Sequence, residues 1–301
     1  MRGPAPRRGF LGIGRLDGLC AEFVDCIICY MLRRSSLIGI LLVGTAVHAQ
    51  WVNYADPRTP RTKDGKPNLT APAPRRNGKP DFTGVWQGQK VSSKELAAMP
   101  DDITKVQVDI VDLTTNAINV FWGTKPEEEP LQPGAAEILK QRSTENPPTS
   151  RCLPAGVPFG TGVYALKMIQ TPQEIVVLNE TGDPPRQIYT DGRSLPNNPD
   201  PIWMGYSTGR WQGDTLVVDT IGFNDRAWLD GFGHPRSESM HVTERYRRLD
   251  FGHMELEVLI EDAKYYTHPF SFKTNFQLLP DSDILEFVCA ENEKDRAHMA
   301  N

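Results

Sequence analysis

The chain has 301 residues, with 33 Lys and Arg against 38 Asp and Glu, which gives a formal net charge of −5. An acidic chain lacks the concentrated basic surface that phosphate backbones require, so nucleic acid is excluded as an expected partner. Walker and HExxH motifs are absent, the CxxC at Cys26 and Cys29 lies ahead of the predicted domain, and no GxSxG follows a predicted strand, so we expect neither a metal nor a cofactor.

The first 49 residues differ from the rest of the chain. Met31-Leu32-Arg33-Arg34 is a short basic region, residues 35–47 are small and apolar, and Val47-His48-Ala49 offers the small residues of a signal-peptidase site. The pattern predicts a signal peptide at 31–49, because its apolar core is too short to remain anchored in a bilayer. Residues 1–30 are explained by a start codon assigned too early, the alternative being a cytoplasmic extension before a signal anchor. We therefore expect an exported protein, periplasmic or extracellular, with no stable membrane insertion.

Cysteine usage agrees with export. Without residues 1–49 the chain keeps only Cys152 and Cys289, and its charge becomes 27 bases (33 − 6) against 35 acids (38 − 3), or −8. Two cysteines in an exported protein are more often bridged than free. The alternative, a Cys nucleophile, needs a nearby base, and neither Cys has a His within several positions. The sequence predicts a Cys152–Cys289 disulfide.

Residues 50–80 are predicted to be a Pro-rich extended arm. This segment has almost no apolar residues, so it cannot bury enough surface to offset its ordering entropy. It holds most of a near-repeat, DGKPNLT at 64–70 and NGKPDFT at 77–83. A single folded domain is expected at 81–295, followed by a tail at 296–301.

The folded domain is predicted to be mainly β. Two short helices are expected first, at 93–99 and 134–142, the second with Pro133 at its opening. Beyond Pro148 the apolar residues alternate with period two, which predicts strands at 163–169, 174–179, 186–190, 215–221, 240–248, 254–260, 270–279 and 284–289. Eight or nine strands separated by turn residues indicate an antiparallel meander closed as a barrel or folded as a sandwich.

Alternation assigns faces to the strands at 240–248 and 254–260. Their apolar faces match if they pair around the turn at 249–252, which puts arginines opposite glutamates on the outer surface: Arg245 and Arg247, Glu255 and Glu257. Glu244 and Tyr246 then point inward. A buried carboxylate must be paired or neutralised, so Glu244 is either satisfied by an Arg or Tyr, or acts as a general base or ligand anchor.

A loop rich in carboxylates and aromatic residues follows the strand at 215–221. Asp225, Asp230 and His234 could perform acid–base chemistry there. The alternative is a turn in which Trp228 and its neighbours plug the end of the barrel. His241 begins the next strand and lies on the opposite face from Glu244, so the two do not make a ready pair of metal ligands.

A second loop could cover a pocket. Asp191-Gly192 is predicted to be a hairpin turn, and Arg193 and Trp203 would then flank a long Pro-rich loop that covers a ligand pocket or packs on the barrel.

Two resemblances add to this interpretation. Gly84-Val85-Trp86, with a later Trp-x-Gly-Asp-x-Leu at 211–216, resembles the lipocalin, or calycin, barrels, in which a Trp near the first strand closes one end. More of the chain resembles a family of exported bacterial proteins of unassigned function, abundant in Acidobacteria-like genomes. The matching pieces are GKPDFTGVW (78–86), RCLPAGVP (151–158), IQTPQEIVVLNE (169–180), RQIYTDGR (186–193), GRWQGDTLVVDTIGFND (209–225), WLDGFGHP (228–235), HVTERYRR (241–248) and LEFVCAEN (285–292). This second resemblance implies no reaction.

Three functions follow from these patterns. The first is a small-molecule or glycan-fragment binding protein with a pocket at the barrel mouth, lined by Arg193, Trp203, Trp228, Asp230, Glu244 and Tyr246. The second is a hydrolase or lyase that uses Glu244 or Asp225 as base with His234 or His241 as partner. The third is a structural or surface-interaction protein whose barrel is filled. The sequence leaves the ligand and the oligomeric state open.

Overall fold

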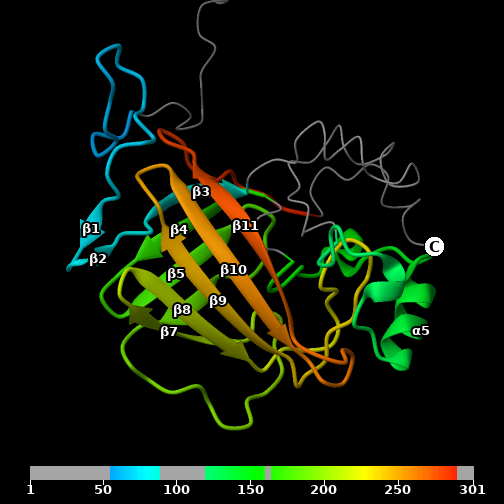
Figure 1. Cartoon of the computed structure of the whole chain (residues 1–301). Helices are drawn as coiled ribbons and strands as arrows, with labels where there is room; N and C mark the ends of the chain where they lie inside the picture. The colour runs from blue at the N-terminus through cyan, green and yellow to red at the C-terminus, as the bar shows by residue number, and fades with distance from the viewer. Residues whose placement is uncertain (1–54, 89–118, 160–163, 290–301) are drawn as a thin grey trace, which may run out of the picture. The chain divides into compact units, whose positions relative to one another are not determined.

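A computed structural model describes residues 55–88, 119–159 and 164–289. Nine strands form a closed barrel in the order β10-β11-β3-β4-β5-β6-β7-β8-β9 (Figure 1). The strands are β3 (Gly84–Gly88), β4 (Leu166–Gln170), β5 (Glu174–Asn179), β6 (Arg186–Tyr189), β7 (Tyr206–Gln212), β8 (Thr215–Ile221), β9 (His241–Arg248), β10 (His253–Glu261) and β11 (Phe270–Leu278). The mainly β, lipocalin-like barrel predicted from the sequence is confirmed, as a barrel rather than a sandwich.

Helices are few in the described ranges. The second predicted helix is present as α5 (Pro133–Arg142), with Pro133 in its first turn, whereas the first, at 93–99, lies outside the described residues. Two short 3₁₀ turns, η1 (Pro126–Glu128) and η2 (Pro148–Arg151), flank α5 in the chain. Among the residues described, no helix combines the length and hydropathy needed to cross a membrane.

The prediction of a strand at 284–289 is wrong. No ladder forms there, and the segment's apolar residues are half exposed: Leu285, Phe287 and Val288. Alternation in the sequence indicated a buried face, but the barrel closes through β11 and β3 before this segment is reached. The segment is instead held by the Cys152–Cys289 disulfide, as predicted, and by Glu180, which accepts a hydrogen bond from the Leu285 amide at 2.8 Å.

The β6–β7 connection also departs from the sequence prediction. Asp191-Gly192 does not turn a hairpin, because β6 and β7 pair in parallel, with Ile188 opposite Ser207. The chain therefore crosses from one end of the barrel to the other between residues 190 and 205. An Asp-Gly turn needs only local conformation, so it does not by itself fix which strands pair.

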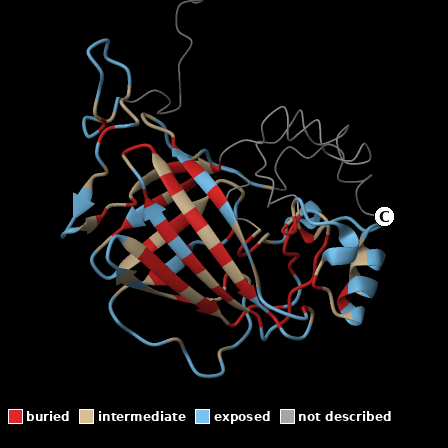
Figure 2. Ribbon diagram, viewed as in Figure 1, coloured by how far each residue is buried: buried red, intermediate tan, exposed pale blue. Residues whose placement is uncertain are grey.

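The β9–β10 hairpin follows the predicted register, and the neighbouring pairs β7–β8 and β10–β11 are hairpins as well. Gly213-Asp214 joins β7 to β8 as a two-residue turn, with Gln212 opposite Thr215. In β9 and β10, Arg247 lies opposite Glu255, and Arg245 lies opposite Glu257 on the outer surface. Inward and outward residues alternate along these strands (Figure 2).

Large side chains fill the barrel interior. The inward residues of β3, β4, β9 and β11 include the bulkiest, and each is at most 2% exposed: Trp86, Leu166, Met168, Tyr246 and Phe276. At one end, which we call the short-turn end, the turns at 171–173, 213–214 and 249–252 are brief. Long loops at the other end, the mouth end, contribute Val157, Phe223, Leu229 and Tyr266 to the same core.

The arm ends in two small hairpins built on the near-repeat. Arg61 bridges Pro67 across Gly65, and β1 (Arg75–Arg76) pairs with β2 (Lys79–Pro80) across Asn77-Gly78. Each hairpin places one arginine on an aspartate at the short-turn end: Arg61 on Asp281 at 2.7 Å and Arg75 on Asp214 at 2.6 Å. Between the hairpins, the carbonyls of Leu69 and Ala71 accept hydrogen bonds from Gly252 and Phe251. The two copies thus fasten the arm to the barrel in the same way.

Candidate functional site

Glu244 lies in a closed polar network at the centre of the barrel. Arg186 Nη1 donates to Glu244 Oε1 at 3.0 Å, and Nη2 donates both to the second carboxylate oxygen and, at 3.0 Å, to Thr220 Oγ1. The Tyr246 hydroxyl donates to Glu244 Oε1 at 2.8 Å, and Ser207 Oγ accepts from Arg186 Nε at 3.2 Å. All five side chains are at most 2% exposed. Glu244 is therefore a carboxylate satisfied by an Arg and a Tyr, and its network fills space that a ligand would need.

Ser207 has the spacing of a nucleophile motif but not its structure. Gly205 to Gly209 reads GYSTG, a GxSxG, yet Ser207 lies within β7 rather than on a turn between a strand and a helix. Its hydroxyl points into the barrel, 3.0 Å from Thr220 Oγ1. Its partners are an arginine and a threonine, with no base among them, so the motif is part of the buried network.

His234 lies between two carboxylates at the mouth end. Its Nδ1 is 2.5 Å from Asp230 Oδ2, and its Nε2 is 3.2 Å from Glu129 Oε2. His234 is 1% exposed, and the Glu129 side chain is 6% exposed. Asp230 Oδ1 accepts the amides of Phe232, Gly233 and His234, and Oδ2 accepts the amide of Val120 at 2.9 Å. We call Glu129, His234 and Asp230 the clasp.

The clasp favours a protonated histidine. Burial alone would lower the pKa of His234, but the Asp230 and Glu129 carboxylates outweigh it and raise the pKa to about 9. Both ring nitrogens are engaged, so neither is left to exchange a proton with a bound molecule. The sequence pointed to Asp230 and His234 but not to Glu129, which is 105 positions away in the chain.

A buried arginine holds the RCLPAGVP segment. Arg236 is fully buried and donates to the carbonyls of Asn224, Val157 and Trp203 at 2.9, 2.8 and 3.1 Å. Burial lowers the pKa of Arg236 to about 9. Asp183 accepts the amide of Ala155 at 2.8 Å from the neighbouring loop. Together with the disulfide, these contacts give many residues of the RCLPAGVP segment a structural role.

The remaining predicted site residues do not converge. Asp225 is exposed, and Arg193 is a surface residue that pairs with Asp191 and stacks on Tyr189 at 3.7 Å. His241 faces outward, within 3.3 Å of both Asp219 and Glu261.

Two predicted pocket residues pack against cations instead. Trp228 is buried under Arg142, whose guanidinium lies 5.4 Å from the ring centroid, and the half-buried Trp203 lies under Arg226 at 4.8 Å. No described contact brings Glu244, Asp225, His234 and His241 into one cluster.

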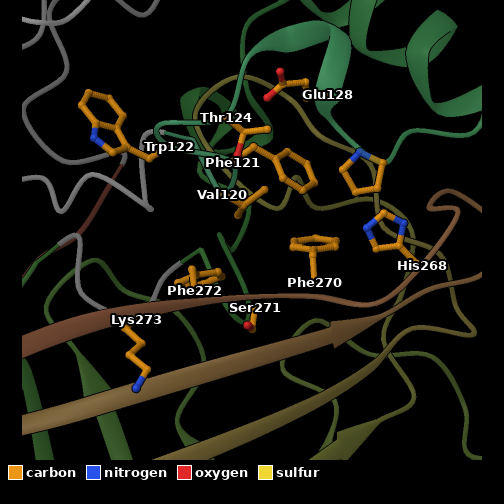
Figure 3. Close-up of a pocket in the computed structure, with 11 residues that line it drawn as sticks. Val120, Phe121, Trp122, Thr124, Glu128, His268, Phe270, Ser271, Phe272 and Lys273 are labelled. Carbon is orange, nitrogen blue, oxygen red and sulfur yellow. The ribbon is translucent and has the colours of Figure 1, made fainter.

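A pocket of about 410 Å³ opens at the mouth end beside β11 (Figure 3). Its floor and one wall come from β11 and His268, two positions before the strand, and its other wall comes from residues 120–130. The lining residues are Val120, Phe121, Trp122, Thr124, Glu128, Pro130, His268, Phe270, Ser271, Phe272 and Lys273. We call this the mouth pocket, and it shares no residue with the pocket predicted from the sequence.

Aromatic rings form the apolar part of the mouth pocket. Phe270 and Phe272 belong to the inward face of β11, but at this end they are only half buried. The Phe121 ring centroid is 4.5 Å from that of Phe270 and 5.0 Å from that of His234. Trp122 is partly exposed; its backbone amide donates to the Asn119 carbonyl at 3.1 Å, and its side chain makes no hydrogen bond or ring contact with the described residues. Thr124 and Glu128 supply polar groups on the 120–130 wall, whereas Ser271 and Lys273 lie on the exposed, outward face of β11 (Figure 3).

The sequence carried a signal for this pocket. Val120-Phe121-Trp122 is an apolar run outside any predicted element, and large apolar residues in a loop need a partner surface. Phe270 and Phe272 also lie at the start of β11, at the mouth of the barrel, where no further strand residues cover them. Neither signal says that the two segments meet.

Within the described ranges no group of three or more His, Cys, Asp or Glu side chains is arranged to hold a metal ion. The chain matches no protein-family model, no curated protein and no solved structure.

Proposed function

We propose that this chain is an exported binding protein for a small molecule or glycan fragment, which it holds in the mouth pocket. The observation that carries the proposal is the pocket itself, about 410 Å³ with aromatic walls and polar groups around them. That volume lies within the roughly 300–1,000 Å³ that is typical of small-ligand sites, and the lining is more polar than in most of them. An aromatic face such as that of Trp122 suits the apolar face of a sugar ring or another flat ligand.

The filled barrel favours a second candidate. Because the buried Glu244–Arg186 network and its neighbours occupy the interior, the barrel can also serve as a rigid scaffold for a surface interaction. The acid–base chemistry of a hydrolase or lyase finds less support, since Glu244 and His234 are each fully engaged with buried partners.

Ligand capture tests the first candidate. The protein is purified from the periplasm or medium of an expressing bacterium, and the molecules released on denaturation are identified by mass spectrometry; N-terminal sequencing shows whether the mature chain begins at Gln50. A glycan array provides candidates if nothing copurifies.

Substitutions then locate the site. Phe270→Ala and Trp122→Ala are expected to weaken binding of the identified ligand at least tenfold. Trp203→Ala, an equally large truncation at the same end of the barrel, should leave it unchanged. Equal losses from all three variants, or losses only at Trp203, would place the ligand elsewhere.

A further inference from the structure

We infer that the clasp, Glu129–His234–Asp230, sets the shape of the mouth pocket by holding its 120–130 wall against the barrel while His234 carries a proton. This inference rests on the proposed function only in taking the mouth pocket as the binding site. It assigns His234 a positioning role and predicts that the pocket is open to regulation by pH.

The wall is attached to the clasp at both of its ends. The amide of Val120 donates to Asp230 Oδ2 at 2.9 Å, and the side chain of Glu129 contacts His234 Nε2 at 3.2 Å. The pocket residues Phe121 to Glu128 lie between these two points in the chain. Phe121 also packs edge-on against the His234 ring, 5.0 Å between centroids, so its position in the pocket depends on that ring.

The other side of the clasp belongs to the barrel. Asp230 and His234 lie in the loop between β8 and β9, and three amides of that loop converge on Asp230 Oδ1. Besides its two contacts with the clasp, the wall is held by the bridge between Leu131 and Tyr266 and by the Pro130 carbonyl, which accepts from the Thr267 amide at 2.8 Å. Loss of the clasp would therefore free residues 120–129 and leave Pro130 and Leu131 in place.

The hydrogen-bond inventory of imidazole makes the clasp depend on protonation. A protonated ring donates from both nitrogens and so satisfies both carboxylates, whereas a neutral ring donates from one and turns a lone pair toward the other carboxylate. Burial strengthens this difference, because a carboxylate without a donor is costly away from water.

Within the described ranges, the other charged or titratable groups near the ring are Arg142, Tyr266 and Asp262. Arg142 donates to the Gly233 carbonyl at 3.0 Å, and the Tyr266 hydroxyl donates to the Pro235 carbonyl at 2.6 Å. Asp262, which follows β10, accepts a hydrogen bond from the Ser237 amide at 2.6 Å. None of these three groups bonds the ring, whereas two carboxylates bond it directly and favour its protonation. The pKa of His234, raised to about 9, agrees with a clasp that is closed at neutral pH.

Amide hydrogen exchange of the full chain tests the inference without any ligand. Protection factors, which remove the intrinsic pH dependence of exchange, are measured from pH 6 to 10 for peptides covering 119–131, with peptides of β10 as an internal reference for global folding. In the wild type, protection of the wall should fall at least tenfold as the pH rises through about 9, while β10 remains protected.

Two variants and a matched control complete the test. His234→Gln should lower wall protection at pH 7 and abolish its pH dependence, and Glu129→Gln should move the transition to lower pH. His268→Gln, which removes a histidine from the rim of the same pocket, should change neither.

A wild-type wall equally protected at pH 7 and 10, or an unchanged pH transition in His234→Gln, would overturn the inference. The wild-type pH series decides the matter even if a variant fails to fold. If the exchange test fails but Phe270→Ala still weakens binding at least tenfold, the role of the clasp is disproved and the proposed function stands. If the exchange test succeeds but Phe270→Ala leaves binding unchanged, the clasp stands and the mouth pocket is not the binding site.

Discussion

The most consequential single residue in the barrel is Glu244. Replacement of Glu244 by Gln leaves Arg186 as a buried cation without a counter-ion, and breaking a buried pair from one side typically costs about 3–5 kcal/mol. We expect a loss of this size in the free energy of unfolding, measured by urea denaturation with tryptophan fluorescence. Glu255→Gln is the matched control, because Glu255 faces Arg247 at 3.7 Å on the surface, where a pair contributes less than about 1 kcal/mol. Similar losses in both variants would show that the buried pair is not a stabilising unit.

His234 should make stability depend on pH. Its pKa in the folded chain, about 9, is above the ordinary 6.5, so the stabilisation is fully present below about pH 6.5 and is lost as the pH rises through about 9. A shift of this size corresponds to a contribution on the order of 3 kcal/mol. The difference in unfolding free energy between the wild type and His234→Gln should therefore be largest at pH 6 and shrink toward pH 10. A difference that is constant over this range would contradict the assignment.

Alternation along a single strand predicted which way a side chain points, but not which residue it meets. It placed Glu244 and Tyr246 inside the barrel and required a partner for the carboxylate. It could not choose Arg186, because that residue reaches Glu244 from β6, which is not a hydrogen-bonded neighbour of β9. The partner of His234 on segment 119–131 was hidden for the same reason: the contact depends on how two loops meet, which local pattern does not encode.

Among the elements, the arm depends on one close approach. A Cβ at Gly252 would lie 2.5 Å from Leu69 Cβ, although the Gly252 backbone angles suit any residue, so Gly252→Ala acts by displacing the arm rather than by straining the turn. We expect faster tryptic cleavage after Arg61 and Lys63, followed by mass spectrometry of timed digests. Gly134→Ala, which meets nothing within 4 Å, is the control and should leave these rates unchanged. Unaltered cleavage in Gly252→Ala would mean that the arm does not need this contact.

Hairpin elements were the most predictable because a short turn fixes both the pairing and the register. The turns at Gly213-Asp214 and at 249–252 each fix the register of the strands that they join. The register at 249–252 places the arginines of β9 opposite the glutamates of β10. The parallel β6–β7 pair could not be found in this way, since its strands are joined by a crossing loop of 16 residues, from 190 to 205, that leaves the register to tertiary packing. The segment at 284–289 shows the opposite error: its residues alternate as in a strand, but no free strand edge lies beside it to pair with.

For the whole molecule, strand number predicted a barrel but not its contents. Eight to nine strands enclose a space that side chains can just fill or that can hold one small ligand. Here Trp86, Tyr246 and Phe276 take that space, so the pocket is displaced from the barrel axis to the mouth, between β11 and residues 120–130. Side-chain volume summed over non-adjacent strands decides between these outcomes, and it cannot be read from periodicity.

The disulfide joins the segment before β4 to the segment after β11. Cys152 precedes β4, Cys289 follows β11, and 137 positions separate them, so in the chain-entropy treatment the bridge stabilises by roughly 5 kcal/mol, with smaller values common in practice. The Cys152→Ser, Cys289→Ser double variant should therefore unfold at lower urea concentration, and reduction of the wild type with dithiothreitol should reproduce the shift. Because Leu285 to Cys289 lies outside the barrel ladder, its release should raise amide exchange in that segment first, while β9 and β10 keep their protection below the unfolding transition. If the reduced protein unfolds at the same urea concentration as the oxidised one, then Glu180, Asp183 and Arg236 suffice to hold these segments, and the bridge adds nothing to the stability of the barrel.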